Sequence, residues 1–274
     1  MGVLDGRAAI VTGSARGIGR AAAVLLAEHG ARVLVTDLDA DLADEAASAI
    51  PGETAVVAGD LTSDGVPEAV VQRAIDEFGQ LDIVVNNAGY TWDGMAHKLS
   101  DEQFRAMLEI HTIAPFRLLR AAAPYLREAG KADKEAGREV FRKVVNVTSI
   151  SGTQGNVGQA NYAAAKAGLV GLTKSLAREW GPFKVNVNAV AFGFVDTRLT
   201  AASDEGETIT RGDAEIPLGI PGKMRELAST IIPLGRPATP DEAAGAIFFL
   251  CSPWSNFVHG QVLTVNGGQT TGMT

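Results

Sequence analysis

The sequence predicts an α/β protein built on one parallel sheet that is doubly wound, with helices on both faces. Short runs of β-branched and other apolar residues recur along the chain, and longer alanine-rich segments with helical patterning separate them. The short runs carry apolar residues at consecutive positions, which is typical of strands covered on both faces. Regular alternation of strand and helix favours right-handed crossovers, and therefore a parallel sheet.

Each element follows from this alternation. The predicted strands are Ala8–Thr12, Arg32–Thr36, Ala55–Ala58, Ile83–Asn86, Lys143–Thr148, Asn186–Val190 and Val262–Val265. The predicted helices are Gly17–His29, Leu42–Ile50, Pro67–Phe78, Asp101–Arg127, Tyr162–Trp180 and Pro240–Leu250. Because no repeat, low-complexity tract or linker divides the chain, we expect residues 1–274 to form a single domain.

Two segments interrupt the rhythm. Residues 128–142 carry mixed charges at helical spacing, which predicts a solvated extension of the preceding helix. Residues 197–236 form a long connection punctuated by Gly and Pro, too long for an ordinary turn. Such connections are commonly lids or binding loops, although some are plain insertions, and we expect a substrate lid here.

Composition excludes several classes of protein. Of the 274 residues, 46% are hydrophobic, which excludes a mainly disordered chain. The net charge of −8 argues against nucleic acid or an anionic membrane as partner. Apolar runs stay far short of the roughly 20 residues of a membrane span, and the first residues do not resemble a signal peptide. With a single cysteine, Cys251, and four scattered histidines, we expect a cytoplasmic protein without a metal site.

A glycine-rich turn follows the first predicted strand. Gly13, Gly17 and Gly19 stand in a G-x3-G-x-G spacing just before a predicted helix. Glycines there let the backbone turn sharply and approach a pyrophosphate, which the N-terminus of the helix attracts. Many such turns need glycine for geometry alone, but the position between strand and helix favours a dinucleotide site.

Asp37 ends the second predicted strand, about 20 residues beyond the turn, where an acid often hydrogen-bonds the ribose 2′-hydroxyl. A carboxylate there would repel a 2′-phosphate, and the next residues supply no cation. The alternative role for Asp37 is a helix N-cap, which Asp39 could also fill. We therefore predict NAD in preference to NADP.

Tyr162 and Lys166 lie one helical turn apart, and such a pair also arises by chance. A phenol ionises near pH 10, so it needs help to act as an acid–base catalyst at neutral pH, and a nearby ammonium favours the phenolate. Ser149 closes the fifth predicted strand, where its hydroxyl would hold a substrate carbonyl oxygen or simply cap a turn. These three residues predict acid–base chemistry at the carboxyl edge of the sheet.

The chain resembles the short-chain dehydrogenase/reductase family over its whole length, and within that family the 3-oxoacyl-ACP reductases. The motifs occur in the family's order: TGSARGIG at 12–19, Asp37, Asp60-Leu61, NNAG at 86–89, Ser149, Tyr162 and Lys166, Asp196-Thr197, PLGR at 233–236 and VNGG at 265–268. The resemblance implies a Rossmann-type fold with a seven-stranded parallel sheet, and a homotetramer.

The resemblance also implies the role of each matched residue. Ser149, Tyr162 and Lys166 would be catalytic, and Lys166 would also bind the nicotinamide ribose and lower the tyrosine pKa. His111 takes the position of a fourth catalytic residue, usually asparagine, which helps kink the long helix and whose main-chain carbonyl holds a water that connects Lys166 to solvent. The implied cofactor-binding residues are Gly13, Arg16, Gly17, Ile18, Gly19, Asp37, Asp60, Leu61, Asn87, Ala88, Gly89, Tyr162, Lys166, Val195 and Thr197.

Three departures from the family pattern stand out. His111 replaces the usual asparagine, which questions the proton relay; we expect the imidazole to be neutral and hydrogen-bonded to backbone. Phe192 replaces a proline and His259 a threonine, changes that we expect to alter packing.

Two functions follow from the sequence. The first is an NAD(H)-dependent oxidoreductase that interconverts a secondary alcohol and a ketone, either as a 3-oxoacyl reductase or as a hydroxyacyl or steroid-like alcohol dehydrogenase. The alternative is a nucleotide-binding sensor or scaffold that has kept the fold and lost turnover. The presence of Ser149, Tyr162 and Lys166 favours the enzyme, whereas His111 weakly favours the alternative.

Overall fold

The parallel sheet predicted from the sequence lies at the centre of the molecule. In the computed structural model, residues 2–201, 208–211, 214–220 and 222–270 are described. Within them, seven parallel strands are arranged in the order β3-β2-β1-β4-β5-β6-β9. Their bounds are β1 (Ala8–Thr12), β2 (Arg32–Asp37), β3 (Thr54–Ala58), β4 (Ile83–Asn86), β5 (Arg142–Ser149), β6 (Val185–Phe192) and β9 (Val262–Val265). The prediction of a doubly wound α/β fold is confirmed, with β5 and β6 longer than expected.

The chain reverses its direction of winding between β1 and β4. These neighbours pair in register, with Ile10 beside both Leu34 of β2 and Val84 of β4. The helices that follow β1 and β2 lie on one face of the sheet, and the helices before and after β4 lie on the other. In such sheets the ligand crevice opens at the carboxyl ends of the strands beside the reversal.

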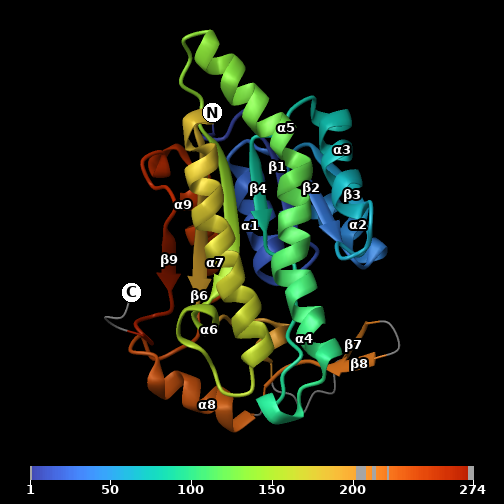
Figure 1. Cartoon of the computed structure of the whole chain (residues 1–274), viewed down its shortest axis with the longest axis vertical. Coiled ribbons are helices and arrows are strands. Elements are labelled where there is room, and N and C mark those ends of the chain that lie inside the picture. Colours follow the sequence, from blue (N-terminus) through green and yellow to red (C-terminus); the bar gives the residue numbers. More distant parts are fainter. Residues whose placement is uncertain (1, 202–207, 212–213, 221, 271–274) are drawn as a thin grey trace.

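Helices cover both faces of the sheet (Figure 1). One layer contains α1 (Gly17–Glu28), α2 (Ala40–Ala49) and α9 (Pro240–Cys251), and the other contains α3 (Val66–Phe78), α5 (Ala114–Glu135) and α7 (Ala160–Trp180). Adjacent residues of β1 serve the two cores: Val11 lies in the cluster with Leu26, and Ile10 in the cluster with Leu118. Among the helices of the described ranges, none is long and apolar enough to cross a membrane.

Smaller elements gather at the carboxyl edge of the sheet, at the bottom of Figure 1. They are α4 (Asp101–Leu108), α6 (Ile150–Gln154), β7 (Thr208–Arg211), β8 (Ala214–Pro217) and α8 (Gly222–Ile231). β7 and β8 pair antiparallel as a hairpin that the sequence did not predict. The hairpin and α8 belong to the predicted lid at 197–236, of which 202–207, 212–213 and 221 lie outside the described residues.

The helix predicted over Asp101–Arg127 is present, with a change of helical type near His111. Between α4 and α5 the chain forms a π-helical turn, Glu109–Ile113, in which the Ala114 N–H bonds the Glu109 carbonyl five residues back. Pro115 favours this break, because proline has no N–H to donate to the His111 carbonyl four residues earlier. The π-turn widens the helix where it faces the site.

The prediction of a solvated extension at 128–142 is only partly right. The helix does continue, to Glu135, but Asp133 and Arg142 are 7% and 8% exposed. Arg142 lies 3.0 Å from the Asp133 carboxylate, which also bonds Arg138 at 2.7 Å. The buried ion pair therefore fixes the end of α5 beside Arg142, the first residue of β5.

Candidate active site

The glycine-rich turn between β1 and α1 is shaped by close approach of backbone. Gly13 has φ +63°, and a Cβ at this position would lie 2.8 Å from the Ala88 Cα. A Cβ at Gly19 would lie 2.1 Å from the Gly13 carbonyl oxygen. Gly17 has φ +52° and opens α1, whose first N–H groups are left for a ligand. The turn therefore forms a side-chain-free cradle that fits a pyrophosphate.

Thr12 joins this turn to the segment after β4. Its hydroxyl accepts hydrogen bonds from the N–H groups of Asn87 and Ala88, both at 2.9 Å. The Asn87 amide in return donates to the carbonyls of Thr12 and Gly13 at 2.9 and 3.1 Å. The two loops are thus fixed relative to each other before any ligand binds.

Asp37 is oriented by backbone donors at the end of β2. Its carboxylate accepts from the Ala15 N–H at 3.2 Å and from its neighbour Leu38 N–H at 2.8 Å. The N-cap of α2 is Asp39, which accepts from the Leu42 N–H, so capping does not explain Asp37. Asp39 also lies 3.7 Å from the Arg16 guanidinium, so an acid accompanies the cation nearest the turn.

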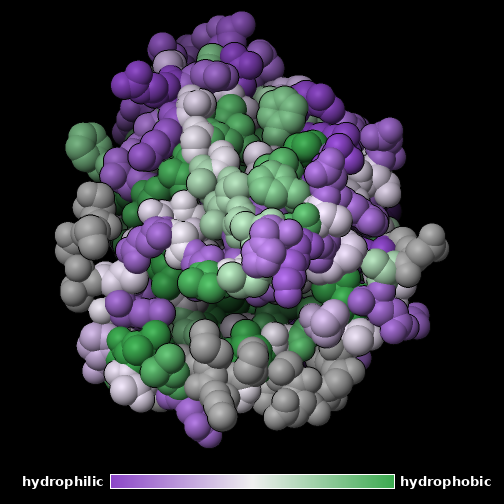
Figure 2. All heavy atoms as spheres, turned by 60° about the horizontal axis from the view of Figure 1, so that its bottom comes forward, coloured by the Kyte–Doolittle hydropathy of each residue, from purple (hydrophilic) through white to green (hydrophobic). Residues whose placement is uncertain are grey.

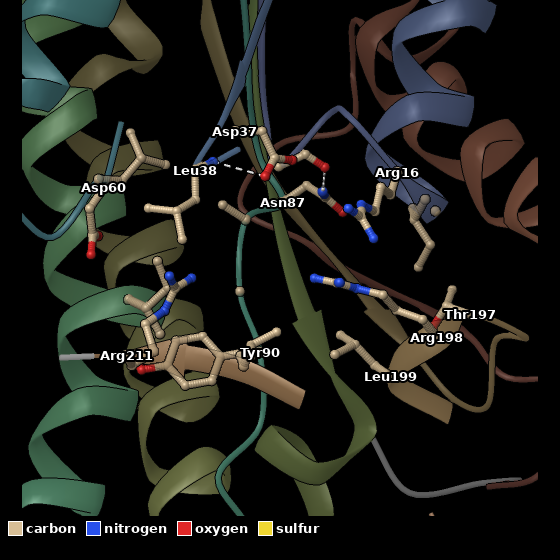
Figure 3. Close-up of a pocket in the computed structure, with 18 of the residues that line it drawn as sticks. Arg16, Asp37, Leu38, Asp60, Asn87, Tyr90, Thr197, Arg198, Leu199 and Arg211 are labelled. Carbon is tan, nitrogen blue, oxygen red and sulfur yellow. Dashed lines mark hydrogen bonds between the residues drawn. The ribbon is translucent and has the colours of Figure 1, made fainter. Parts of the chain in front are cut away.

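A cavity of about 370 Å³ opens beside these groups at the carboxyl edge of the sheet. Figure 2 shows the hollowed face, with hydrophobic residues gathered along the hollow, and Figure 3 shows the cavity. Of the residues predicted to bind the cofactor, those lining the cavity are Gly13, Arg16, Gly17, Ile18, Asp37, Asp60, Leu61, Asn87, Ala88, Gly89 and Thr197. Gly19, Val195, Tyr162 and Lys166 are not among the lining residues.

The cavity has further walls that sequence reasoning missed. They are Leu38, Gly59, Tyr90, Ile110, Arg198, Leu199, Ile209 and Arg211. Leu38 and Tyr90 directly follow predicted site residues, so adjacency was a usable signal. Ile209 and Arg211 belong to β7, and only the folding of the hairpin across the site brings them there (Figure 3).

The residues predicted to be catalytic meet at the start of α7. Asn161 anchors this end of the helix by donating to the carbonyls of Trp92 and Gln103 at 2.9 and 3.2 Å. Tyr162 is half-buried and packs against an apolar cluster that includes Met107 of α4 and Ile216 of β8. Tyr162 therefore lies where the body of the protein meets the hairpin of the predicted lid.

Ser149 ends β5 and serves two neighbours. Its hydroxyl accepts from the Ser151 N–H at 3.1 Å, which caps α6, and its side chain is also close enough to Tyr162 to act on the phenol. The capping role that the sequence left open is thus present, together with contact to the predicted acid–base residue.

Lys166 does not lower the Tyr162 pKa as predicted. Burial raises the pKa of Tyr162 to about 12; the Ser149 hydrogen bond opposes this shift and the Asp93 charge adds to it. Burial also lowers the pKa of Lys166 to about 7, and its amine donates to the Val147 carbonyl at 2.7 Å. Desolvation is the largest cause of both shifts and disfavours the phenolate and the ammonium alike, so the phenol keeps its proton at neutral pH.

His111 lies in the π-turn and is 3% exposed. Its Nε2 bonds the Tyr90 carbonyl at 2.7 Å, the backbone contact expected from the sequence, and its ring meets Tyr162 edge-on at 5.0 Å between centroids. A Cβ at Gly89 would lie 2.2 Å from the imidazole Cε1, so glycine makes room for the histidine. Burial, followed by the Lys166 charge, lowers the pKa of His111 well below 6.5. With Nε2 donating, Nδ1 is a lone-pair acceptor that has no partner among the described residues.

The other two departures are structural. His259 links β6 to α7, because its Nδ1 accepts from the Val187 N–H at 3.3 Å and its Nε2 bonds the Ala177 carbonyl at 2.7 Å. Phe192 is buried in the core at the end of β6.

Comparison with known proteins gives two family matches. The model described as short chain dehydrogenase matches residues 7–208, and one described as Enoyl-(Acyl carrier protein) reductase matches residues 222–270. The 3-oxoacyl-(acyl-carrier-protein) reductase of Vibrio cholerae is 40% identical over 266 residues, which cover 97% of this chain and 98% of the relative. The reductase of the same name from Thermotoga maritima is 34% identical over 268 residues, which cover 97% of this chain and 98% of the relative. That of Escherichia coli is 36% identical over 264 residues, which cover 96% of this chain and 97% of the relative.

These matches cover the glycine turn, the cavity and α7 together. The chain is an oxidoreductase of the short chain dehydrogenase family.

Proposed function

We propose that the protein is an NAD(H)-dependent oxidoreductase that interconverts a secondary alcohol and a ketone, with Tyr162 as the acid–base residue. The observation that carries this proposal is the contact of Tyr162 with both Ser149 and His111 beside the glycine-lined cavity. A carbonyl oxygen that reached the phenol would meet a proton donor and a second hydroxyl at one point.

The residues of the cavity fit a nicotinamide dinucleotide. Gly13, Gly17 and Gly19 would hold the pyrophosphate, Asp37 the adenosine ribose and Asp60 with Leu61 the adenine. The remaining wall would be supplied by Arg16, Ile18, Asn87, Ala88, Gly89 and Thr197. Val195, which does not line the cavity, would meet the nicotinamide through its backbone. Preference for NAD over NADP is supported by the backbone-held carboxylate of Asp37 and by the pairing of Arg16 with Asp39. When bound, the nicotinamide supplies or accepts the hydride.

Proton transfer falls to Tyr162. Because its pKa is raised to about 12, the phenol carries its proton at neutral pH and suits the reducing direction. In that direction the phenol donates its proton to the substrate oxygen, which becomes the hydroxyl of the alcohol, while Ser149 holds the same oxygen. The resulting phenolate then takes a proton back through Lys166.

Lys166 and His111 would assist this proton transfer. Lys166, with a pKa of about 7, is poised to gain and lose a proton near neutral pH, and it would also hold the nicotinamide ribose. His111 would keep the π-turn in place through Tyr90, as the asparagine of the family does, and remain neutral.

The relatives suggest the first substrates to test. Several are named 3-oxoacyl-(acyl-carrier-protein) reductases, and we extend that substrate class to this chain as part of the proposal. The test is NADH oxidation with a 3-oxoacyl thioester and with a panel of ketones, each repeated with NADPH. Turnover with NADH supports the proposal. Binding of NADH without turnover of any carbonyl would favour the sensor or scaffold alternative instead.

We also propose that residues 1–274 act as one domain in a cytoplasmic homotetramer, with residues 197–236 as the substrate lid. The family resemblance supports the tetramer, and the packing of the hairpin against Tyr162 supports the lid. Light scattering during gel filtration measures the assembly, and a monomer would contradict it.

A further inference from the structure

The strand β7 of the lid hairpin reaches the cavity with two side chains, Ile209 and Arg211. Arg211 lies on the side of the cavity that also holds Leu38 and Asp60 (Figure 3). These two residues directly follow β2 and β3, and neither is adjacent in sequence to Ser149 or Tyr162.

Arg211 is held in place by Tyr90. The guanidinium carbon lies 4.9 Å from the centroid of the Tyr90 ring, a cation–π contact. Tyr90 is 6% exposed. Burial raises the pKa of Tyr90; the nearby Arg211 opposes the shift, and the Asp60 charge adds to it. Both Arg211 and Asp60 are therefore close enough to act on one phenol.

The hairpin itself is seated on the body of the protein. Ile216 of β8 is 1% exposed and packs in one cluster with Tyr90, Met107 and Ile110. This apolar base leaves Arg211 as the charged group that the hairpin presents to the cavity beside Leu38 and Leu61.

We propose that Arg211 binds the adenosine half of the cofactor, so that the dinucleotide itself fixes the lid hairpin over the cavity. The inference rests on the proposed function, which assigns Asp37, Asp60 and Leu61 to adenosine. A guanidinium is planar and carries only donors, so it can stack on the face of an adenine while donating to a ribose oxygen, or lie at the adenine edge and donate to a ring nitrogen. Lid closure would then be linked to cofactor binding and would precede the arrival of the carbonyl substrate.

The test is the Kd of NADH, measured by its fluorescence, in the wild type and in Arg211→Met. The variant keeps the length of the side chain and removes its charge and plane, and we expect its Kd to rise about tenfold. Arg211→Lys keeps the charge but not the plane. On a logarithmic scale, its Kd for NADH should lie closer to that of Arg211→Met than to that of the wild type. Arg73→Met removes an exposed arginine from α3 and is the matched control, with an unchanged Kd.

Limited proteolysis with thermolysin provides a second readout. AMP, which carries the adenosine half alone, should slow cleavage of the hairpin in the wild type and not in Arg211→Met. Nicotinamide mononucleotide, which lacks adenosine, should protect neither protein.

The outcomes separate this inference from the proposed function. A Kd for NADH within twofold of the wild type in Arg211→Met would overturn the role of Arg211. A loss seen with NADPH alone would also overturn it and assign Arg211 to a 2′-phosphate. Absence of turnover with every carbonyl, together with the expected change in Kd, would defeat the proposed reaction and leave this inference standing. A wild type that binds neither dinucleotide would overturn both.

Discussion

The nucleotide half of the site, from β1 to β2, takes its shape from backbone, whereas the catalytic half, from β5 to α7, depends on buried side chains. In the first half, glycines avoid contacts of 2.1 and 2.8 Å, and backbone N–H groups orient Asp37. In the second half, desolvation moves the pKa values of Tyr162 and Lys166 in opposite directions. Substitutions in the nucleotide half should therefore weaken cofactor binding, whereas substitutions in the catalytic half should impair proton transfer.

The largest effect tests the catalytic half. Tyr162→Phe removes the proton donor and keeps the ring against His111, so we expect kcat to fall at least about a hundredfold. The Kd of NADH should stay within about threefold, because the nucleotide half is unchanged. Steady-state kinetics and NADH fluorescence measure the two quantities. Tyr125→Phe on α5 is the control, and a Tyr162→Phe rate above a tenth of wild type would contradict the assigned role.

Asp37→Ser tests the nucleotide half. For the wild type we expect kcat/KM at least about tenfold higher with NADH than with NADPH, equivalent to about 1.4 kcal/mol. Removing the carboxylate should bring this ratio toward one, because it removes both the ribose acceptor and the repulsion of a 2′-phosphate. The same exchange at the exposed Asp44 of α2 should leave the ratio alone. A wild type that uses both cofactors equally would show that Asp37 does not select between them.

His111→Asn tests whether burial governs the catalytic half. The His111 pKa in the folded protein lies below its unfolded value, so below about pH 6.5 the unfolded chain takes up a proton before the folded one does. The histidine therefore lowers the free energy of unfolding as the pH falls through this range, and activity should fall at still lower pH as the imidazole protonates.

The variant should remain active, lose part of the acid limb of the rate profile, and show a smaller fall in Tm between pH 7.5 and 5.5. His97→Asn, at an exposed position, is the control. An inactive variant, or unchanged profiles of rate and Tm, would show a different role for His111.

The smallest effect concerns the proposed lid, whose hairpin lines the cavity and packs in the cluster that includes Tyr162. Arg225 of α8 bonds the Asp196 carboxylate at 2.8 Å and the Thr200 carbonyl at 3.1 Å, near the surface. Arg225→Ala should raise KM for the carbonyl substrate two- to fivefold, since exposed ion pairs contribute little. We expect kcat to stay near that of wild type, and Arg73→Ala provides the matched control. A large loss of kcat would mean that the lid also positions the catalytic half.

The sequence predicted the glycine turn and the position of Asp37 because these signals are local. A glycine that must adopt positive φ, or an acid that ends a strand, is visible in a few consecutive residues, as at Gly13 and Asp37. The parallel sheet also followed from regular alternation.

The remaining features depend on distant contacts. The raised pKa of Tyr162 comes from what covers the phenol, and Arg211 reaches the cavity only because the hairpin folds back over Tyr90. The burial of Asp133 likewise required Arg142, from a different element, to lie beside it. Spacing along one helix could not reveal any of these three.

The π-turn at Glu109–Ile113 determines which face of α5 is turned toward the sheet. Each residue of an α-helix turns about 100° around the axis, so the extra residue rotates α5 by that angle relative to α4. Deleting one residue here would restore a regular helix and turn Leu118, Ala122 and Leu126 away from the sheet that they now cover. Insertions and deletions should therefore be excluded from this stretch during evolution, even though single substitutions such as asparagine to histidine are accommodated within it.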